Sequence, residues 1–335
     1  MSDTLLSVDQ ARELARRALE GAGARPAAAE ALATAIVAAE LDGIPSHGLA
    51  YLPTYCEHLR CGKVRGDAEP RLERHRPGVL TVDAGSGFAH PAIATGFEAL
   101  IPSAREQGTA ALAVINSYNC GVLGYHTEQL AAAGLVGLGF TNAPASIAPW
   151  GGHRPVVGTN PMSLAVPDGQ GGVQLLIDQS ASVVAKSEVM ARHRAGESLP
   201  EGWALDADGR PTTDPEAALA GTMMPSGGYK GFGAGLISEV FAAVLAGPHL
   251  GIEASPFSGT RGGPPQTGQL FIALDPAAFS GADFGERMTR LVEAVAGQDA
   301  RVPGRRRRSN RARIRAAGIT VRDELLARLR ALEAT

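Results

Sequence analysis

A serine and a histidine stand next to each other in the segment DGIPSHGLAYLPTYCEHLRCGKV, residues 42–64. Histidine titrates near neutral pH, so His47 can give a proton to a substrate and recover it. Reduction of a C=O or C=N bond needs such a proton on the heteroatom, besides a hydride on carbon. The same residues also fit an ordinary helix start with Ser46 as its N-cap. A catalytic role for His47 therefore requires a partner, a cofactor and a substrate-binding group elsewhere in the chain.

Asp178 is the candidate partner of His47. It follows the apolar run VQLLI, which is typical of a buried strand, and sites in α/β proteins gather their groups at strand ends. A carboxylate that holds an imidazole fixes its orientation and raises its pKa. We therefore expect the pKa of His47 to be raised by Asp178. The alternative is an aspartate that only caps the following turn.

Three segments rich in glycine and polar residues are candidates for holding a cofactor. They are NSYNCG (116–121), GTNP (158–161) and SGGYKGFG (226–233). Clustered backbone N–H groups and helix N-termini bind phosphates, and Lys230 would add a positive charge. The arginines of PGRRRRSNRAR (303–313), predicted as a loop, would suit phosphates or a 2′-phosphate. Each segment alone also fits an ordinary turn, cap or solvated basic loop.

The two common nucleotide-binding fingerprints are absent from the sequence. GSGFAH, from Gly85, follows a predicted strand but lacks the third glycine of G-x-G-x-x-G, and GFGAGL, from Gly231, follows a lysine rather than a strand. No G-x-x-x-x-G-K-[ST] motif occurs. A nucleotide site in this chain must therefore be built without a Rossmann domain or a P-loop.

The secondary-structure elements that must position these residues change along the chain, from helices alone to alternating strands and helices. A capping box at Ser7 and Gln10 predicts a first helix, Pro26 begins a second, and a third follows His47 with Pro53 near its first turn. Further on, short β-branched runs alternate with helical patterns, which predicts an α/β lobe. We expect strands at 78–85, 110–117, 135–143, 173–180 and the start of 269–279, and helices at 90–108, 124–134, 235–247 and 320–334.

Composition excludes several classes of function. Of 335 residues, 44% are hydrophobic and 19% charged, which suits a globular protein, and the net charge of -3 gives no general attraction to nucleic acid. Three cysteines without CxxC spacing argue against a disulfide framework or a zinc site, and we expect no metal. The first residues do not fit a signal peptide, and no apolar run is long enough to span a membrane. We expect a cytoplasmic protein that contacts neither membrane nor nucleic acid.

Eight segments occur in one order over nearly the whole chain. They are SHG, NSYNCG, TNAPASIAPWGG, VGTNPMSLAVP, LLIDQSASVVA, PEGWALDADGRPTTDP, GGYKGFG and PGRRRR. In this order the sequence resembles the malate/L-lactate dehydrogenase family of non-Rossmann fold. That family includes ureidoglycolate dehydrogenases, sulfolactate dehydrogenases, diketogulonate reductases and Δ1-piperideine-2-carboxylate reductases.

The resemblance implies an α/β protein with two lobes. One is a non-Rossmann, NAD(P)-binding α/β lobe, and the other is a helical lobe built from both chain ends. On this chain it gives residues 1–72 to the helical lobe, 73–290 to the cofactor lobe with a surface excursion at 186–222, and 291–335 to a segment that returns to the helical lobe. It also implies a homodimer with its active site near the subunit interface.

The resemblance also assigns site residues. Ser46, His47 and Asp178 match the proton-transfer unit of the piperideine-2-carboxylate reductases. Thr159 joins the substrate site. We expect NADPH in preference to NADH, because of the arginines at 305–308. The residues assigned to the cofactor are Asn116, Ser117, Tyr118, Asn119, Cys120, Asp178, Ser180, Tyr229, Lys230, Pro303, Gly304, Arg305 and Arg308.

Two positions depart from the pattern of the family. Many hydroxy-acid members read S-H-G-x-x-R, but here the last position is Tyr51, which lies one turn beyond His47 if that segment is helical. A phenol cannot replace a bidentate guanidinium. We therefore assign the substrate carboxylate to Arg60 and place Tyr51 in the substrate site. Many members also carry a histidine where this chain has Asn119, which can orient a group but cannot shuttle protons.

These departures favour reduction of a cyclic imino acid (a ketimine) or a 2-oxo acid by NAD(P)H, with the hydride from nicotinamide and the proton from His47. Two alternatives stay open. One is a 2-hydroxy-acid dehydrogenase of the malate, lactate or ureidoglycolate type that works in the oxidative direction. The other is a catalytically impaired homologue that only binds a nucleotide.

Overall fold

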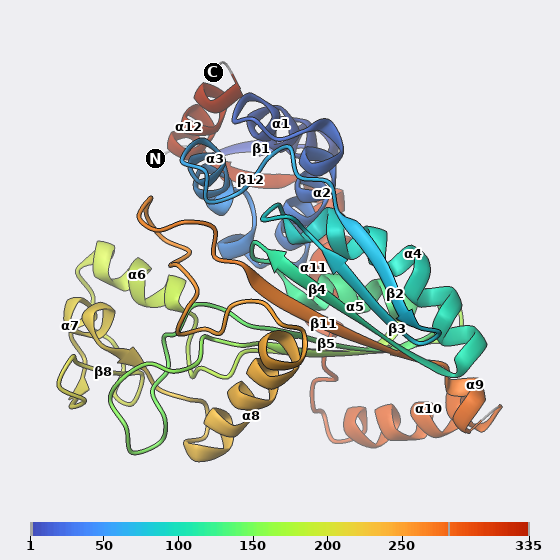
Figure 1. Cartoon of the computed structure of the whole chain (residues 1–335). Coiled ribbons are helices and arrows are strands. Elements are labelled where there is room, and N and C mark those ends of the chain that lie inside the picture. The colour runs from blue at the N-terminus through green and yellow to red at the C-terminus, as the bar shows by residue number, and fades with distance from the viewer. Residues whose placement is uncertain (1–2, 281, 334–335) are drawn as a thin grey trace.

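A seven-stranded sheet forms the centre of the larger lobe (Figure 1). The computed structural model describes residues 3–280 and 282–333. The strand order is β2-β3-β4-β11-β5-β6-β7; β3 and β4 pair in parallel, and the other neighbours are antiparallel. The strands are β2 (Arg71–Arg76), β3 (Val79–Asp83), β4 (Thr109–Ser117), β5 (Val136–Thr141), β6 (Met162–Pro167), β7 (Val173–Gln179) and β11 (Thr267–Leu274). The expected strands are thus confirmed, and β2 and β6 are additional.

Two helices cover one face of this sheet. α4 (Ala89–Gln107) connects the parallel strands β3 and β4, and α5 (Leu123–Ala132) lies against β5, β6 and β7. Ile93 and Phe97 of α4 are buried together with Leu112 of β4, each contributing about 1.5–3 kcal/mol through removal of apolar surface from water. Gly96 allows this close approach, because a Cβ there would lie 2.3 Å from Leu112. The α/β lobe expected from the sequence is confirmed.

The helical lobe is built from both chain ends, as expected. α1 (Val8–Gly21), α2 (Pro26–Asp42) and α3 (Leu52–Arg60) share one core with α12 (Asp323–Glu333). The predicted capping box is present, because Ser7 accepts the N–H of Gln10 and the Gln10 side chain accepts the N–H of Ser7. Strand β1 (Asp3–Leu6) pairs antiparallel with β12 (Ile319–Arg322), so the two ends of the chain lie side by side (Figure 1).

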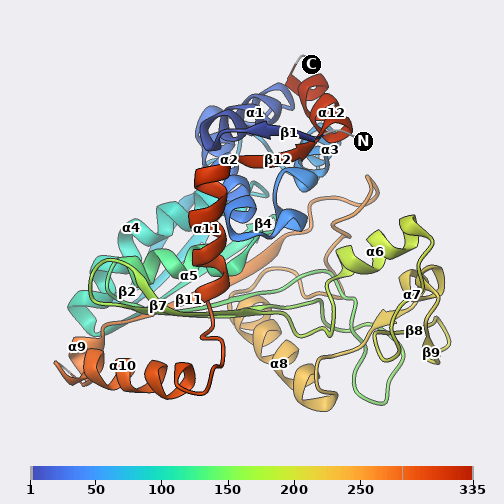
Figure 2. The same cartoon turned by 180° about the vertical axis from the view of Figure 1, so that it is seen from behind.

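The interval 186–222, predicted as a surface excursion, carries its own small core. Its three short strands pair in the order β10-β8-β9, and Val189, Leu199, Ala204 and Ala218 are buried together. Figure 2 shows this unit beside α8 and away from the helical lobe. Its elements are α6 (Lys186–Ala195), β8 (Ala204–Leu205), β9 (Pro211–Thr212), α7 (Pro215–Ala220) and β10 (Thr222–Met223).

The expected helix at 235–247 is present, but it begins earlier and changes its winding. α8 (Tyr229–Glu239) continues into a π-helix, η3 (Val240–Leu245), which packs against β11 and β5. Phe241 of η3 stacks on Phe140 at a ring-centroid distance of 4.6 Å. The remaining helices of the larger lobe are α9 (Pro276–Phe279) and α10 (Asp283–Ala296).

Two expectations about the C-terminal part were wrong. Residues 303–313 were predicted as a basic loop, but a helix, α11 (Arg305–Ala317), begins within them. Arginine is a good helix former, and acidic side chains of other elements neutralise the inner face of α11. Residues 320–322 were predicted as helix, but they belong to β12 because they pair with β1. The last residue of that predicted helix, residue 334, lies outside the described residues.

The third helix also differs in detail from the expectation. Two single 3-10 turns, η1 (Pro45–His47) and η2 (Leu49–Tyr51), precede α3, and Pro53 lies in the first turn of α3 as predicted. Gly48 separates the two turns with an extended backbone, at φ -93° and ψ -145°. His47 and Tyr51 therefore do not sit on one face of a continuous α-helix. Within the described residues, no helix has the length and apolar character needed to cross a membrane.

Candidate active site

The Ser46–His47 pair lies in the turn between α2 and α3. The hydroxyl Oγ of Ser46 is 3.1 Å from Nδ1 of His47. The His47 ring is half-buried, so part of it stays accessible from outside. Because Nδ1 is engaged with Ser46, Nε2 is the nitrogen that can face a substrate.

A half-buried glutamate of α2 holds this turn. Glu40 of α2 accepts the N–H of Leu49 at 2.7 Å. A Cβ on Gly48 would lie 2.1 Å from the same carboxylate oxygen of Glu40, so a side chain at this position would displace Glu40. Burial raises the pKa of Glu40, and the hydrogen bond from Leu49 opposes that rise. The conformation of the SHG segment therefore depends on a contact with α2.

Asp178, at the end of β7, lies close enough to His47 to act on its charge, but its hydrogen bonds go elsewhere. Its Oδ2 accepts the N–H of Gly124 in the first turn of α5 at 3.0 Å and Nη2 of Arg307 at 2.7 Å. Asp178 acts to raise the pKa of His47, as expected, but the net shift is downward. Burial lowers the pKa of His47, the charge of Asp178 opposes this, and the charge of Arg307 adds to it.

Arg307 belongs to an ionic network that joins both lobes. On the same face of α11, Arg311 pairs with Asp42 at the end of α2 and with Glu128 of α5. Arg307 also approaches Asp42 at 3.7 Å. The side chains of Asp42, Asp178 and Arg307 are only 2%, 10% and 15% exposed. In the sequence Arg307 was expected, with its neighbouring arginines, to bind phosphates; the i,i+4 spacing of Arg307 and Arg311 is the signal that would have paired them.

The two positions that depart from the family pattern lie in one aromatic cluster. Tyr55 of α3 stands between them: its ring contacts Tyr51 edge-on at 4.8 Å, and its hydroxyl donates to Oδ1 of Asn119 at 3.1 Å. Tyr51 donates to the carbonyl of Phe257 at 3.2 Å. Burial raises the pKa of Tyr51, so this phenol stays neutral at physiological pH. The cluster offers hydroxyl and amide groups and no charge.

The segment 116–121 turns most of its side chains into the protein. Asn116 has a left-handed backbone (φ 52°) and donates to Asp83, while Ser117 bonds to Gln269 inside the core. Tyr118 is buried against the helical lobe, and burial raises the pKa of Cys120 to about 12. Ser117, Tyr118 and Cys120 are therefore structural side chains, and what this segment can offer a cofactor is its backbone.

The predicted cofactor residues at 180, 229 and 230 and the predicted substrate residue Thr159 lie in two places. Tyr229 and Lys230 are exposed at the N-terminus of α8, where they follow two glycines with positive φ. Ser180, just after β7, is half-buried and bonds to Ser182, and Thr159 accepts the N–H of Ala181 through its carbonyl.

The predicted basic residues also differ in their surroundings. Pro303 and Gly304 lead into α11 beside β7, Arg305 is exposed, and Arg308 donates to the carbonyl of Val173. Arg60 is exposed at the last residue of α3, about 13 Å along the helix from Tyr51.

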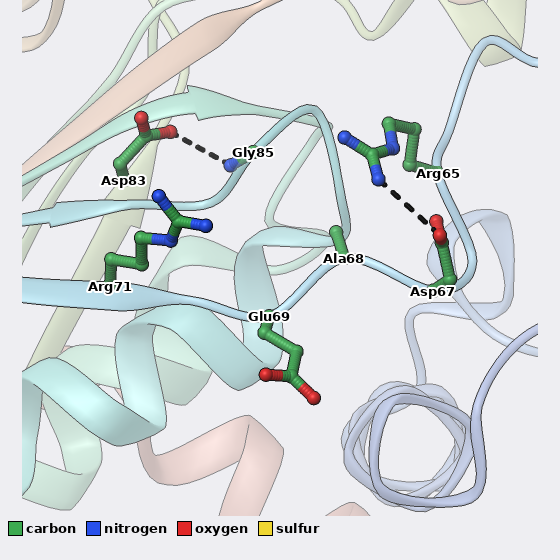
Figure 3. A pocket seen from close by; sticks show the side chains of 7 residues that line it. All are labelled: Arg65, Asp67, Ala68, Glu69, Arg71, Asp83 and Gly85. Atoms are coloured by element: carbon green, nitrogen blue, oxygen red, sulfur yellow. Dashed lines mark hydrogen bonds and ion pairs between the residues drawn. The ribbon is translucent and has the colours of Figure 1, made fainter.

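A surface cavity of about 330 Å³ lies outside this constellation (Figure 3). Figure 3 shows Arg65 paired with Asp67, and Asp83 accepting the N–H of Gly85. Charged residues of both signs line it, and none of the predicted site residues does: the lining is Arg65, Asp67, Ala68, Glu69, Arg71, Asp83 and Gly85. A much smaller hollow lies beside Arg307, between Glu128 and Leu176.

The sequence matches the family model for malate/L-lactate dehydrogenases over residues 6–330. This chain belongs to the malate/L-lactate dehydrogenase family. It is therefore a member of a family of oxidoreductases, as the order of its motifs suggested.

Relatives within the family have more specific names. The chain is 47% identical over 308 residues to a (2R)-3-sulfolactate dehydrogenase (NADP(+)) from Chromohalobacter salexigens, covering 92% of each chain. It is 40% identical over 331 residues to a Δ1-pyrroline-2-carboxylate reductase from Ancylobacter novellus, covering 98% of this chain and 97% of the relative. The crystal structure of Δ1-piperideine-2-carboxylate reductase from Pseudomonas syringae pvar. tomato superimposes with a TM-score of 0.93 at 36% identity, covering 98% of this chain and 99% of that one.

Proposed function

We propose that this chain is an NADPH-dependent reductase of a cyclic imino acid or a 2-oxo acid. The observation that supports the proposal is the contact of Ser46 with Nδ1 of His47 at 3.1 Å, together with the charge of Asp178, which acts on the same ring. The names of the relatives at 40% identity and of the structure at 36% identity support a cyclic imine as substrate.

The residues present fit a dinucleotide. The N-terminus of α8 offers free backbone N–H groups, positive-φ glycines at Gly227 and Gly228, and the exposed ammonium of Lys230, which together suit a pyrophosphate. Arg305 is exposed and suits a 2′-phosphate, which favours NADPH over NADH. When bound, the nicotinamide would supply the hydride to the carbon beside the substrate carboxylate.

Residues of the chain would hold and transfer the proton. Ser46 holds Nδ1 of His47, so Nε2 gives its proton to the imine nitrogen or the oxo oxygen as the hydride arrives at carbon. Asp178 stabilises the positive charge of the ring before that transfer. We assign Tyr51, Asn119 and Thr159 to the walls of the substrate site. Arg60 lies about 13 Å along the helix from Tyr51, too far to bind the carboxylate of a small substrate held there.

A second candidate is oxidation of a 2-hydroxy acid, in which His47 accepts the proton instead. The observation that favours it is the 47% identity to a protein named (2R)-3-sulfolactate dehydrogenase (NADP(+)). The two candidates share the site and differ in the substrate and in the direction of proton transfer.

A comparative turnover assay tests the function. We expect NADPH to be oxidised with Δ1-pyrroline-2-carboxylate or Δ1-piperideine-2-carboxylate, and more slowly or not at all with 2-oxo acids alone. NADH in place of NADPH should give a lower kcat/KM, and equal values would contradict the role of Arg305. Turnover of (2R)-3-sulfolactate with NADP⁺ but of no imine would support the second candidate. Tight NADPH binding without any turnover would instead point to a nucleotide-binding homologue.

We further propose a homodimer. Ile237, Val240, Val244 and Leu245 of α8 and η3 are 48%, 49%, 62% and 65% exposed, and together they form an apolar surface of the kind that subunit interfaces bury. Sedimentation analysis is expected to give twice the mass of one chain. Ile237→Glu with Val244→Glu should give the monomer, and a monomeric parent protein would contradict the assignment.

We also place the protein in the cytoplasm. Cys56, Cys61 and Cys120 are free thiols in the structure, which is the usual state of cysteines in a reducing compartment.

A further inference from the structure

Arg307 holds the carboxylate of Asp178, whose charge acts on His47. Its Nη2 donates to Oδ2 of Asp178 at 2.7 Å, and its Nη1 is buried without a hydrogen-bond acceptor, 3.7 Å from Asp42. A buried guanidinium with an unsatisfied nitrogen is costly, because each unpaired buried donor loses its hydration. A pair that served stability alone would more readily satisfy all its donors.

We propose that Arg307 is a positioning residue for proton transfer: its hydrogen bond fixes the carboxylate of Asp178, the proposed partner of His47. The inference rests on the function proposed above for His47. It assigns to α11 a part in the site that differs from binding the cofactor phosphates.

The geometry supports this role because a second element, α5, holds the same carboxylate together with α11. Gly124 of α5 donates its N–H to the oxygen that Arg307 also contacts, so Asp178 is clamped between α5 and α11. A Cβ on Gly124 would lie 2.7 Å from Nη1 of Arg307 and 2.8 Å from Oδ2 of Asp178. The three groups are thus in direct contact, and loss of Arg307 would leave Asp178 free to turn.

The charged groups around His47 predict in which direction its pKa moves when Arg307 is removed. The charged groups on the elements around the ring are Glu40 and Asp42 of α2, Glu128 of α5, Asp178 of β7, and Arg307 and Arg311 of α11. Of these, Asp178 acts to raise the pKa of His47 and Arg307 acts to lower it. Removing Arg307 deletes the opposing cation and releases Asp178 from its partner, so His47 should retain its proton to higher pH.

Arg311 provides the matched control. It lies one turn later on α11 and pairs with Asp42 and Glu128 in the same network, but it does not contact Asp178. If Arg307 only fastened α11 to the sheet, Arg307→Gln and Arg311→Gln would have the same consequences. If it positions Asp178, only Arg307→Gln alters the titration of His47.

The experiment compares Arg307→Gln, Arg307→Lys and Arg311→Gln in the full-length chain. The His47 ring is titrated by NMR, with its signal assigned by a His47→Asn variant, and kcat/KM is measured as a function of pH. For Arg307→Gln we expect the His47 midpoint to move to higher pH and kcat to fall about 10²-fold, as a small displacement of reacting groups does, with little change in KM for NADPH. Arg307→Lys should restore most of the wild-type midpoint, and Arg311→Gln should leave it in place.

An unchanged His47 midpoint in folded Arg307→Gln, or equal shifts in Arg307→Gln and Arg311→Gln, would overturn the inference. Thermal melting shows which variants are folded, and Arg307→Lys keeps the test open if Arg307→Gln is not. The NMR titration needs no substrate. A wild-type protein that turns over none of the substrates would therefore contradict the proposed function, while the titration would still decide the role of Arg307.

Discussion

Replacing His47 by alanine is expected to lower kcat with a cyclic imine about 10²- to 10⁴-fold, the usual contribution of a positioned general acid. The Kd for NADPH should stay nearly unchanged, because His47 lies on the turn after α2, whereas the phosphate-binding groups are assigned to α8 and α11. Steady-state assays of imine reduction measure kcat, and fluorescence titration with NADPH measures the Kd. Wild-type turnover in His47→Ala would reject the acid role.

His193, an exposed histidine of α6, supplies the control. His193→Ala should retain full activity. Ser46→Ala should lose less activity than His47→Ala, because it removes only the hydrogen bond that orients the ring.

The pH dependence of the same assay has a definite sign. Reduction requires protonated His47, and burial places the pKa of His47 below its ordinary value. The reductive kcat/KM should therefore be greatest in mild acid and fall as pH rises through that lowered pKa. For oxidation of a hydroxy acid, kcat/KM should instead rise with pH, since this reaction requires the neutral His47 ring. A reductive rate that rises with pH would contradict the proposed direction of transfer.

Local patterns in the sequence were sufficient for most of the fold. The capping box at Ser7, the β-branched runs of β3, β4 and β7, and the helical pattern of α4 each carry their own signal, because spacing and turn residues act within one element. The π-helix η3 and the pairing of β1 with β12 carry no such signal. They depend on contacts between residues far apart in the chain.

The site was only partly predictable for the same reason. Ser46, His47 and Asp178 could be named because their motifs stand in family order; in the structure Ser46 contacts His47, and the charge of Asp178 acts on that ring. The sign of the shift at His47 could not be inferred, because it depends on burial and on Arg307, which approaches from a segment expected to be a loop. Ser117 and Tyr118 were assigned to the cofactor, yet their side chains bond within the core, a distinction that residue type alone does not reveal.

Asp178→Asn is expected to affect stability and catalysis together. Asp178 and Arg307 form a buried pair, and removing one charge of such a pair typically costs about 3–5 kcal/mol, because the other charge stays buried without a partner. Guanidinium unfolding measures this loss. As a control, Asp208→Asn breaks a pair with Arg210 whose side chains are 70% and 76% exposed, and it should change stability by less than about 1 kcal/mol.

The double variant Asp178→Asn with Arg307→Gln separates the two effects. It removes both charges, so much of the lost stability should return, because neutral amides replace an unpaired buried cation. Activity should not return, since the carboxylate whose charge acts on His47 is still missing. If turnover recovered together with stability, the loss in Asp178→Asn would reflect misfolding around Arg307, and Asp178 would have no part in holding the proton on His47.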